Sequence, residues 1–275
     1  MRLRLQWFAA LAFPLALCPA LNAQSYDDEL RLGVEAYRGA HYEEAIGHFR
    51  KATELDPSQV AAHMYLATAY VSQYIPGVES PDNLNVAEQA IKQYQQVLDA
   101  DADRTSKINS TKGIAYLLLN MKKFDEARDY YQKASALDPQ DPENYYSIGV
   151  IDWTRCYAPR MAARAKLKMA PEENLDAKNA EQRRICEQLK VDHDSVIEDG
   201  IDNLKRAIEL RPDYDDAMAY MNLMYRERAD LECEDLVARR KDLKTADEWV
   251  DRTMEVKKAK AQRAFPAANQ PAEEK

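Results

Sequence analysis

Apolar and small side chains recur three residues apart in several segments of the chain, and this spacing predicts helices. In the first segment Phe49 and Ala52 lie three residues apart on the same helical face, and Leu55-Asp56-Pro57 follows with a proline that stops the helix. Related phrases occupy residues 94–102, 131–139 and 204–212, and the last two of these also end in proline. A phrase that returns in the same register indicates stacked helical repeats, so the fold is predicted to be all-α.

A second set of small and apolar positions precedes each phrase and predicts a partner helix. A small residue lets two helices approach closely, and a large residue fills the adjoining hole. The residues expected to make these contacts, or to end the helices, are Leu32, Gly33, Ala45, Phe49, Ala52, Pro57, Ala90, Tyr94, Ala127, Tyr131, Ala134, Pro139, Gly149, Gly200, Leu204, Ala207 and Pro212.

This series of residues resembles the tetratricopeptide repeat, a helix–turn–helix unit of about 34 residues. The resemblance implies a right-handed helix–turn–helix solenoid of 4–5 repeats that spans residues 24–263. The expected units are residues 26–59, 60–104, 108–141 and 142–214, followed by a degenerate capping unit at 215–263.

Two of these units are longer than the repeat requires. The second has a turn-rich stretch at residues 74–83, and the fourth has a helical insertion at residues 157–195. Insertions in repeat proteins map to loops, often on the binding side. Each of the two is therefore a candidate for taking part in binding, and the alternative is that it only connects two helices.

The resemblance also implies which side chains face the concave side, because the first helix of each unit lines it. Carried onto this chain, the expected groove residues are Tyr37, Arg38, Met64, Lys112, Tyr116, Asn120, Tyr146, Trp153 and Arg226. Aromatic anchors with arginine are the usual composition of binding hot spots.

The chain is therefore expected to bind a peptide or helix segment of another protein in this groove, through the 157–195 insertion, or both. One alternative is a structural subunit of an envelope assembly whose insertion folds into the groove, so that the aromatic residues are core. A binder of an envelope polymer or a small ligand is the third interpretation.

The first 23 residues predict a secretory signal peptide. Two arginines precede a short apolar run from Trp7 to Leu21, and small residues lead to an expected cleavage after Ala23. This predicts a periplasmic or secreted protein of a bacterial type, with no stable membrane span after cleavage. A lipid anchor at Cys18 and an uncleaved anchor are the alternatives.

Composition separates a folded body from a short tail. The chain is 46% apolar, has only seven glycines, and carries a formal net charge of −9. A net negative charge disfavours nucleic acid as a partner, because its phosphates are also negative. Residues 264–275 are small, polar and proline-bearing, which predicts a disordered tail.

Three cysteines remain after removal of the signal. The preferred hypothesis is a disulfide between Cys156 and Cys186, which would staple the insertion to the stack. A bond between Cys186 and Cys233 and three unpaired thiols are the alternatives.

The insertion is preceded and opened by a basic cluster, which consists of Arg155, Arg160, Arg164, Lys166 and Lys168. Such a cluster either meets an acidic partner or, more commonly, is solvated or paired with acids of the same chain.

Catalytic and metal-binding patterns are not recognisable in the sequence. The four histidines are His41, His48, His63 and His193, and none lies at metal-ligand spacing from another histidine. A Gly-x-Ser-x-Gly elbow, a phosphate loop and a Cys-x-x-Cys motif are all lacking. No enzymatic activity, metal or cofactor is therefore expected.

Overall fold

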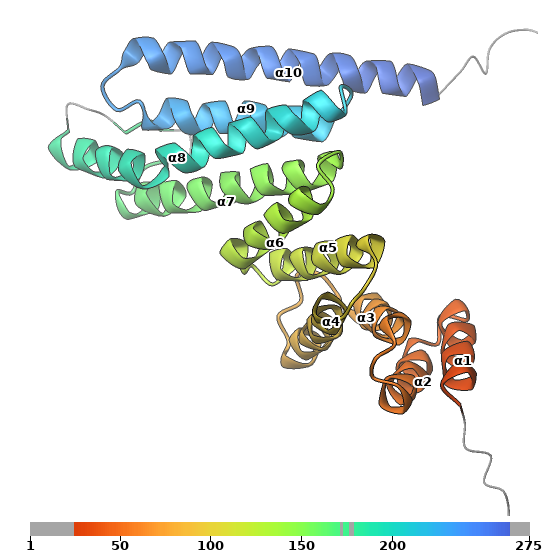
Figure 1. The fold of residues 1–275 in the computed structure, drawn as a ribbon. Coiled ribbons are helices and arrows are strands. Elements are labelled where there is room, and N and C mark those ends of the chain that lie inside the picture. The colour runs from red at the N-terminus through yellow and green to blue at the C-terminus, as the bar shows by residue number, and fades with distance from the viewer. Residues whose placement is uncertain (1–24, 171–172, 176–178, 265–275) are drawn as a thin grey trace, which may run out of the picture.

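The computed structural model describes residues 25–170, 173–175 and 179–264, and this part of the chain contains ten α-helices and no strand (Figure 1). The helices are α1 (Tyr26–Arg38), α2 (Tyr42–Leu55), α3 (Val60–Gln73), α4 (Pro81–Asp99), α5 (Arg104–Asn120), α6 (Phe124–Leu137), α7 (Pro142–Lys166), α8 (Ala180–Leu210), α9 (Asp215–Leu231) and α10 (Leu236–Ala264).

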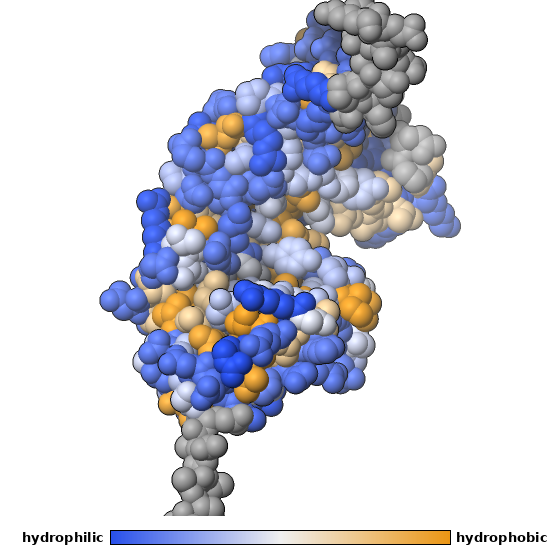
Figure 2. Space-filling view, turned by 90° about the vertical axis from the view of Figure 1, so that its right-hand side faces the viewer, coloured by the Kyte–Doolittle hydropathy of each residue, from blue (hydrophilic) through white to orange (hydrophobic). Residues whose placement is uncertain are grey.

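Consecutive helices pack in pairs, and each pair packs on the next. The pairs α1–α2, α3–α4, α5–α6, α7–α8 and α9–α10 are joined through α2–α3, α4–α5, α6–α7 and α8–α9 contacts, so the stack climbs from α1 to α10 (Figure 1). First helices of neighbouring pairs also meet, α1 with α3 and α7 with α9. We call the side of the stack on which the first helices lie the inner face of the solenoid. Figure 2 shows that the outline of the molecule is hollowed on one side.

Helix starts and stops follow local sequence signals. Ser25 and Asp28 form a capping box at the start of α1, and Ser80, Asp103, Asp141 and Asn179 accept backbone N–H bonds at the starts of α4, α5, α7 and α8. In three of the recurring phrases the helix ends at the leucine two residues before the proline, at Leu55, Leu137 and Leu210. Proline there removes an amide donor and prevents the helix from continuing.

The expected packing positions lie where the helices cross. Gly33 faces the ring of Phe49, and Gly149 faces Leu204; a Cβ at either glycine would lie 2.5 Å from the neighbouring side chain. The buried members of the set are Gly33, Ala45, Phe49, Ala52, Ala90, Tyr94, Ala127, Tyr131, Ala134, Gly149, Gly200, Leu204 and Ala207. Leu32 is half-buried, and the turn residues Pro57, Pro139 and Pro212 are exposed.

A further close crossing, between α4 and α5, involves Gly113, which was not among the expected packing positions. A Cβ at Gly113 would lie 2.5 Å from the ring of Tyr94, so α5 approaches α4 as closely as α1 approaches α2. Because Tyr94 packs against the following pair here, this contact joins two repeats rather than closing one.

The apolar core is divided into two clusters that meet in α7. The first cluster runs from Ala36 on α1 to Ile148 and Ile151 on α7. The second begins at Cys156 on α7 and continues through α8 and α9, with Trp249 and Val256 of α10 packed against it.

The 157–195 insertion lengthens two helices instead of forming a separate arm. Residues 157–166 extend α7 to 25 residues, and residues 180–195 are the beginning of α8, which has 31 residues. Pro159 lies inside α7. The two long helices pack on each other and on α9, and Leu175 between them is buried in the second cluster.

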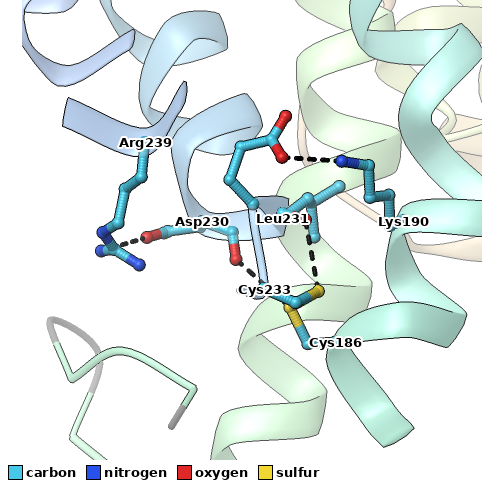
Figure 3. The surroundings of a disulfide bond; sticks show 7 residues. Cys186, Lys190, Asp230, Leu231, Cys233 and Arg239 are labelled. Atoms are coloured by element: carbon cyan, nitrogen blue, oxygen red, sulfur yellow. Dashed lines mark hydrogen bonds and ion pairs between the residues drawn. A yellow bond between two sulfur atoms is a disulfide. The ribbon is translucent and has the colours of Figure 1, made fainter. Parts of the chain in front are cut away.

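The disulfide joins Cys186 to Cys233, so the expected pairing of Cys156 with Cys186 is wrong (Figure 3). Cys186 lies on α8, where its Cα is 5.8 Å from the Cα of Cys233 in the turn between α9 and α10. Cys156 is a free thiol, 2% exposed in the second cluster. Because α8 turns Cys186 toward the α9–α10 turn, the bond closes the last helix pair onto the fourth.

The expected signal peptide at residues 1–23, with Cys18, and the tail beyond Ala264 lie outside the described residues. Among the helices that the structure describes, none is both long and apolar enough to cross a membrane.

Candidate functional site

Five aromatic rings form a continuous ladder along the inner face of the last repeats. Its rings belong to α7, α9 and the N-cap residue of α9, in the order Tyr214, Tyr146, Tyr220, Trp153 and Tyr157. Successive ring centroids are 4.9, 5.7, 5.5 and 4.7 Å apart, within the range in which aromatic pairs attract. Burial raises the pKa of Tyr146 from its ordinary value of 10.0 to about 12.

The ladder ends at a cavity of about 410 Å³ between α7, α9 and α10. Its walls include Trp153, Tyr157, Arg160, Asn174, Arg226 and Arg239. Asn174 belongs to the segment between α7 and α8, so the insertion supplies part of the wall. We call this space the C-terminal cavity.

A network of buried ion pairs forms the floor of the C-terminal cavity. Arg160 donates two hydrogen bonds of 2.6 Å to the carboxylate of Glu227, and its Nη1 lies 2.9 Å from Asp230 Oδ2. Asp230 also accepts from Arg164 at 3.0 Å and from Arg239 at 3.3 Å. Burial raises the pKa of Glu227, an effect that the two bonds from Arg160 oppose. Much of the basic cluster read from the sequence is therefore paired with acids of the same chain.

The disulfide lies close to one pair of this network, Asp230 and Arg239 (Figure 3). Asp230 and Arg239 flank the turn that carries Cys233, and the bond to Cys186 fixes that turn to α8. Beside it Lys190 of α8 donates a 2.7 Å hydrogen bond to Glu232. The turn is thus held from one side by a covalent bond and an ion pair.

Tyrosines also line the inner face of the first three repeats. The hydroxyls of Tyr37 and Ser72 form a 2.9 Å hydrogen bond, and Tyr116 is 41% exposed. From the second helices, Tyr94 and Tyr131 extend inward, where their hydroxyls meet Thr68 and Ser147. Burial raises the pKa of both these tyrosines.

The remaining expected groove residues differ in whether their side chains are bonded within the chain or exposed to solvent. Lys112 donates a hydrogen bond of 2.5 Å to the carboxylate of Asp141, and Asn120 donates one of 2.8 Å to the carbonyl of Tyr116. Met64 is half-buried and accepts from Ser110 at 3.1 Å, whereas Arg38 is exposed.

The structure brings Tyr146, Trp153 and Arg226 together at the ladder and the C-terminal cavity. It leaves Tyr37, Arg38 and Met64 at the other end of the stack.

The expected groove residues did not include Tyr157, Tyr214, Tyr220 or Arg239. Tyr157 lies one helical turn after Trp153, so helical spacing alone could have found it. Arg239 could not be found in this way, because it reaches the cavity from α10, a second helix that the repeat pattern assigns to the outer side.

In the part of the chain that the structure describes, no group of three or more His, Cys, Asp or Glu side chains is arranged to hold a metal ion.

Comparison with known proteins agrees with this architecture. Models of the tetratricopeptide repeat match residues 30–73 and residues 112–141. The chain therefore contains tetratricopeptide repeats in these two stretches. The first match spans most of the first expected unit and continues through α3 of the second. The other match lies in the third unit, and the long fourth unit lies outside both.

Solved structures show the same fold across nearly the whole chain. A crystal structure of MamA protein has a TM-score of 0.57 at 14% identity and covers 90% of this chain and 98% of its own. YrrB, described as a TPR protein with an unusual peptide-binding site, has a TM-score of 0.55 at 14% identity and covers 86% and 89%. MamA from Desulfovibrio magneticus RS-1 has a TM-score of 0.54 at 16% identity and covers 85% and 96%. None of the curated proteins matches this chain.

Proposed function

We propose that this tetratricopeptide repeat protein is an interaction scaffold that holds a segment of another protein along its inner face. The aromatic ladder carries the proposal, because four of its rings keep accessible surface beside an open cavity, namely Tyr146, Tyr220, Trp153 and Tyr157. Tyrosine, tryptophan and arginine dominate binding hot spots, and all three line that end of the ladder. Tyr116 and Tyr157 are 41% and 38% exposed, which leaves ring surface for a ligand to cover.

The comparisons support a peptide as the ligand. YrrB shares the fold, and its description includes a peptide-binding site. An extended or short helical segment suits a curved solenoid, since its inner face offers contacts over several repeats instead of a single enclosed hole.

The place of action would be outside the cytoplasm. The Cys186–Cys233 disulfide supports this proposal, because structural disulfides persist in oxidising compartments. The basic and apolar start of the sequence, with its expected cleavage after Ala23, points the same way.

A self-filled groove is the second candidate, and one observation favours it. Asn174 and Leu175, both from the insertion, lie at the C-terminal cavity or in its adjoining core. If the insertion occupies the site, the protein would be a structural subunit that meets its partners elsewhere.

Selection of peptides by the purified full-length chain separates the two candidates. Random dodecapeptides displayed on phage would be selected on the protein, and the enriched sequences would be synthesised and measured by calorimetry. For a partner in the groove, Tyr116→Ala or Tyr157→Ala should weaken binding about 10-fold or more, which corresponds to about 1.4 kcal/mol.

The matched control is Tyr130→Ala, which removes a half-buried tyrosine from α6, a second helix, where its hydroxyl bonds Gln95 at 3.1 Å. This variant should bind the peptides as the parent does. Failure to enrich any peptide, or binding that none of the groove variants alters, would refute the proposed function.

A further inference from the structure

The C-terminal cavity has a charge arrangement that discriminates between ligands. Both oxygens of Glu227 accept from Arg160, and Asp230 accepts from three guanidinium groups. The two carboxylates of the floor are thus already occupied by internal cations. A cationic ligand would have to displace a buried arginine, and breaking a buried pair is strongly unfavourable.

Two arginines at the cavity can instead receive an anion. Arg239 forms its hydrogen bonds to described residues through Nη2 alone, to Asn174 Oδ1 and Asp230 Oδ1. Its Nε and Nη1 therefore keep their donors, while the bonds of Nη2 hold the guanidinium in place. This arginine is preorganised, because its side chain is only 16% exposed and is fixed from two sides.

Arg226 lies at the rim and is the second receiver. It pairs with Asp247 of α10 at 2.7 Å, but the two side chains are 44% and 68% exposed. Exposed pairs of this kind contribute about 0–1 kcal/mol, so an incoming carboxylate can replace Asp247 at little cost.

Apolar surface adjoins these donors. Trp153 and Tyr157 stack at 4.7 Å on the α7 wall, and Leu223 and Leu243 complete it from α9 and α10. A side chain that enters beside the arginines would bring its neighbour along the peptide onto this aromatic wall. A volume of about 410 Å³ is near the lower end of ligand sites, which suits one or two side chains better than a larger molecule.

Resting on the proposed function, we propose that the C-terminal cavity is a subsite for an acidic side chain of the bound protein segment, received by Arg239 and Arg226. The residue beside that acid in the segment is apolar or aromatic and packs on Trp153 and Tyr157. The Cys186–Cys233 bond positions the subsite, because it fixes the turn between Asp230 and Arg239 (Figure 3).

A double-mutant cycle tests the subsite with a defined probe. The probe is the most enriched acid-bearing dodecapeptide from the selection, together with its Glu→Gln or Asp→Asn version. The acid-to-amide change should weaken binding to the parent about 10-fold or more, as expected for a charge-assisted pair. With Arg239→Gln the same change should have little further effect, and Arg226→Gln should reproduce part of that loss of coupling.

Arg206→Gln is the control, since this arginine of α8 is 40% exposed and pairs locally with Glu209. It should leave the probe's acid dependence unchanged. Because Arg226 is exposed, its variant folds even if Arg239→Gln proves unstable, so the cycle can be completed.

The outcomes separate this inference from the proposed function. Enriched peptides that depend on Tyr116 or Tyr157 but show no preference for Asp or Glu would refute the acidic subsite and leave the groove proposal standing. An acid dependence that persists undiminished in both arginine variants would also refute it. A selection that enriches no peptide refutes both proposals.

Discussion

Removal of the Cys186–Cys233 bond should destabilise the last two helix pairs selectively. The two cysteines are 47 residues apart, and a chain-entropy treatment of a loop of this length gives about 4 kcal/mol at 25 °C. The loop contains most of α8 and all of α9, so the lost stability belongs to the second apolar cluster. In a solenoid each repeat contacts only its neighbours, and the effect on α1–α4 should be small.

The perturbation is the double variant Cys186→Ala, Cys233→Ala, compared with the parent by differential scanning calorimetry and circular dichroism. A loss of about 4 kcal/mol lowers the transition of the C-terminal part by about 8–16 °C for a chain of this size. Reduction of the parent protein should give the same shift without any substitution.

Cys156→Ala is the control, because its thiol is buried but unpaired. This substitution should cost less stability than loss of the bond. Its transition should still fall on reduction, because the Cys186–Cys233 bond remains in this variant. Two results would refute the reasoning: a double variant that melts within about 2 °C of the parent, or a peptide map that links Cys156 to Cys186.

Three further predictions concern single positions. Gly149→Ala should lower the free energy of unfolding by about 1–3 kcal/mol in urea titrations, because its Cβ would lie 2.5 Å from Leu204. Gly47→Ala, which has open space around it, should be neutral or stabilising. Equal effects of the two substitutions would contradict the argument from the close helix crossing. Glu227→Gln should cost about 3 kcal/mol or more, since it removes one of the two carboxylates that pair with the buried Arg160. A change below about 1 kcal/mol would show that the pair is not buried in solution. Burial raises the pKa of Cys156 to about 12 from an unfolded value near 9.0, so its contribution is complete below pH 9 and is lost as the pH rises toward 12. Thermal melts between pH 8 and 11 should therefore fall less steeply for Cys156→Ala than for the parent, and equal slopes would contradict this.

The repeated phrase was sufficient to predict the fold because each unit satisfies the same local contacts. Phe49, Tyr131 and Leu204 fill equivalent holes, and small residues such as Ala45, Ala127 and Ala207 sit at the crossings with no exposed surface. These requirements act within one helix pair, so they are visible in a short window of sequence.

The disulfide and the cavity could not be predicted in the same way, because both depend on how long helices meet. The insertion was read as a segment between the helices of its unit, with Cys186 near Cys156. In the structure, residues 180–195 join α8, and this places Cys186 beside Cys233 of the α9–α10 turn. Arg239 reaches the inner side from α10 for the same reason: position in a long packed helix is set by its neighbours, not by the repeat frame.

The division of the apolar core within α7 has a consequence for motion. The C-terminal cluster carries the covalent cross-link and the buried guanidinium network, whereas in the described residues the N-terminal cluster is held by noncovalent packing. Amide protons of α1–α4 should therefore exchange sooner than those of α8 and α9, through openings that leave the later pairs closed. A ligand anchored on the stiff end would meet a compliant first half, which can adjust its curvature to segments of different length.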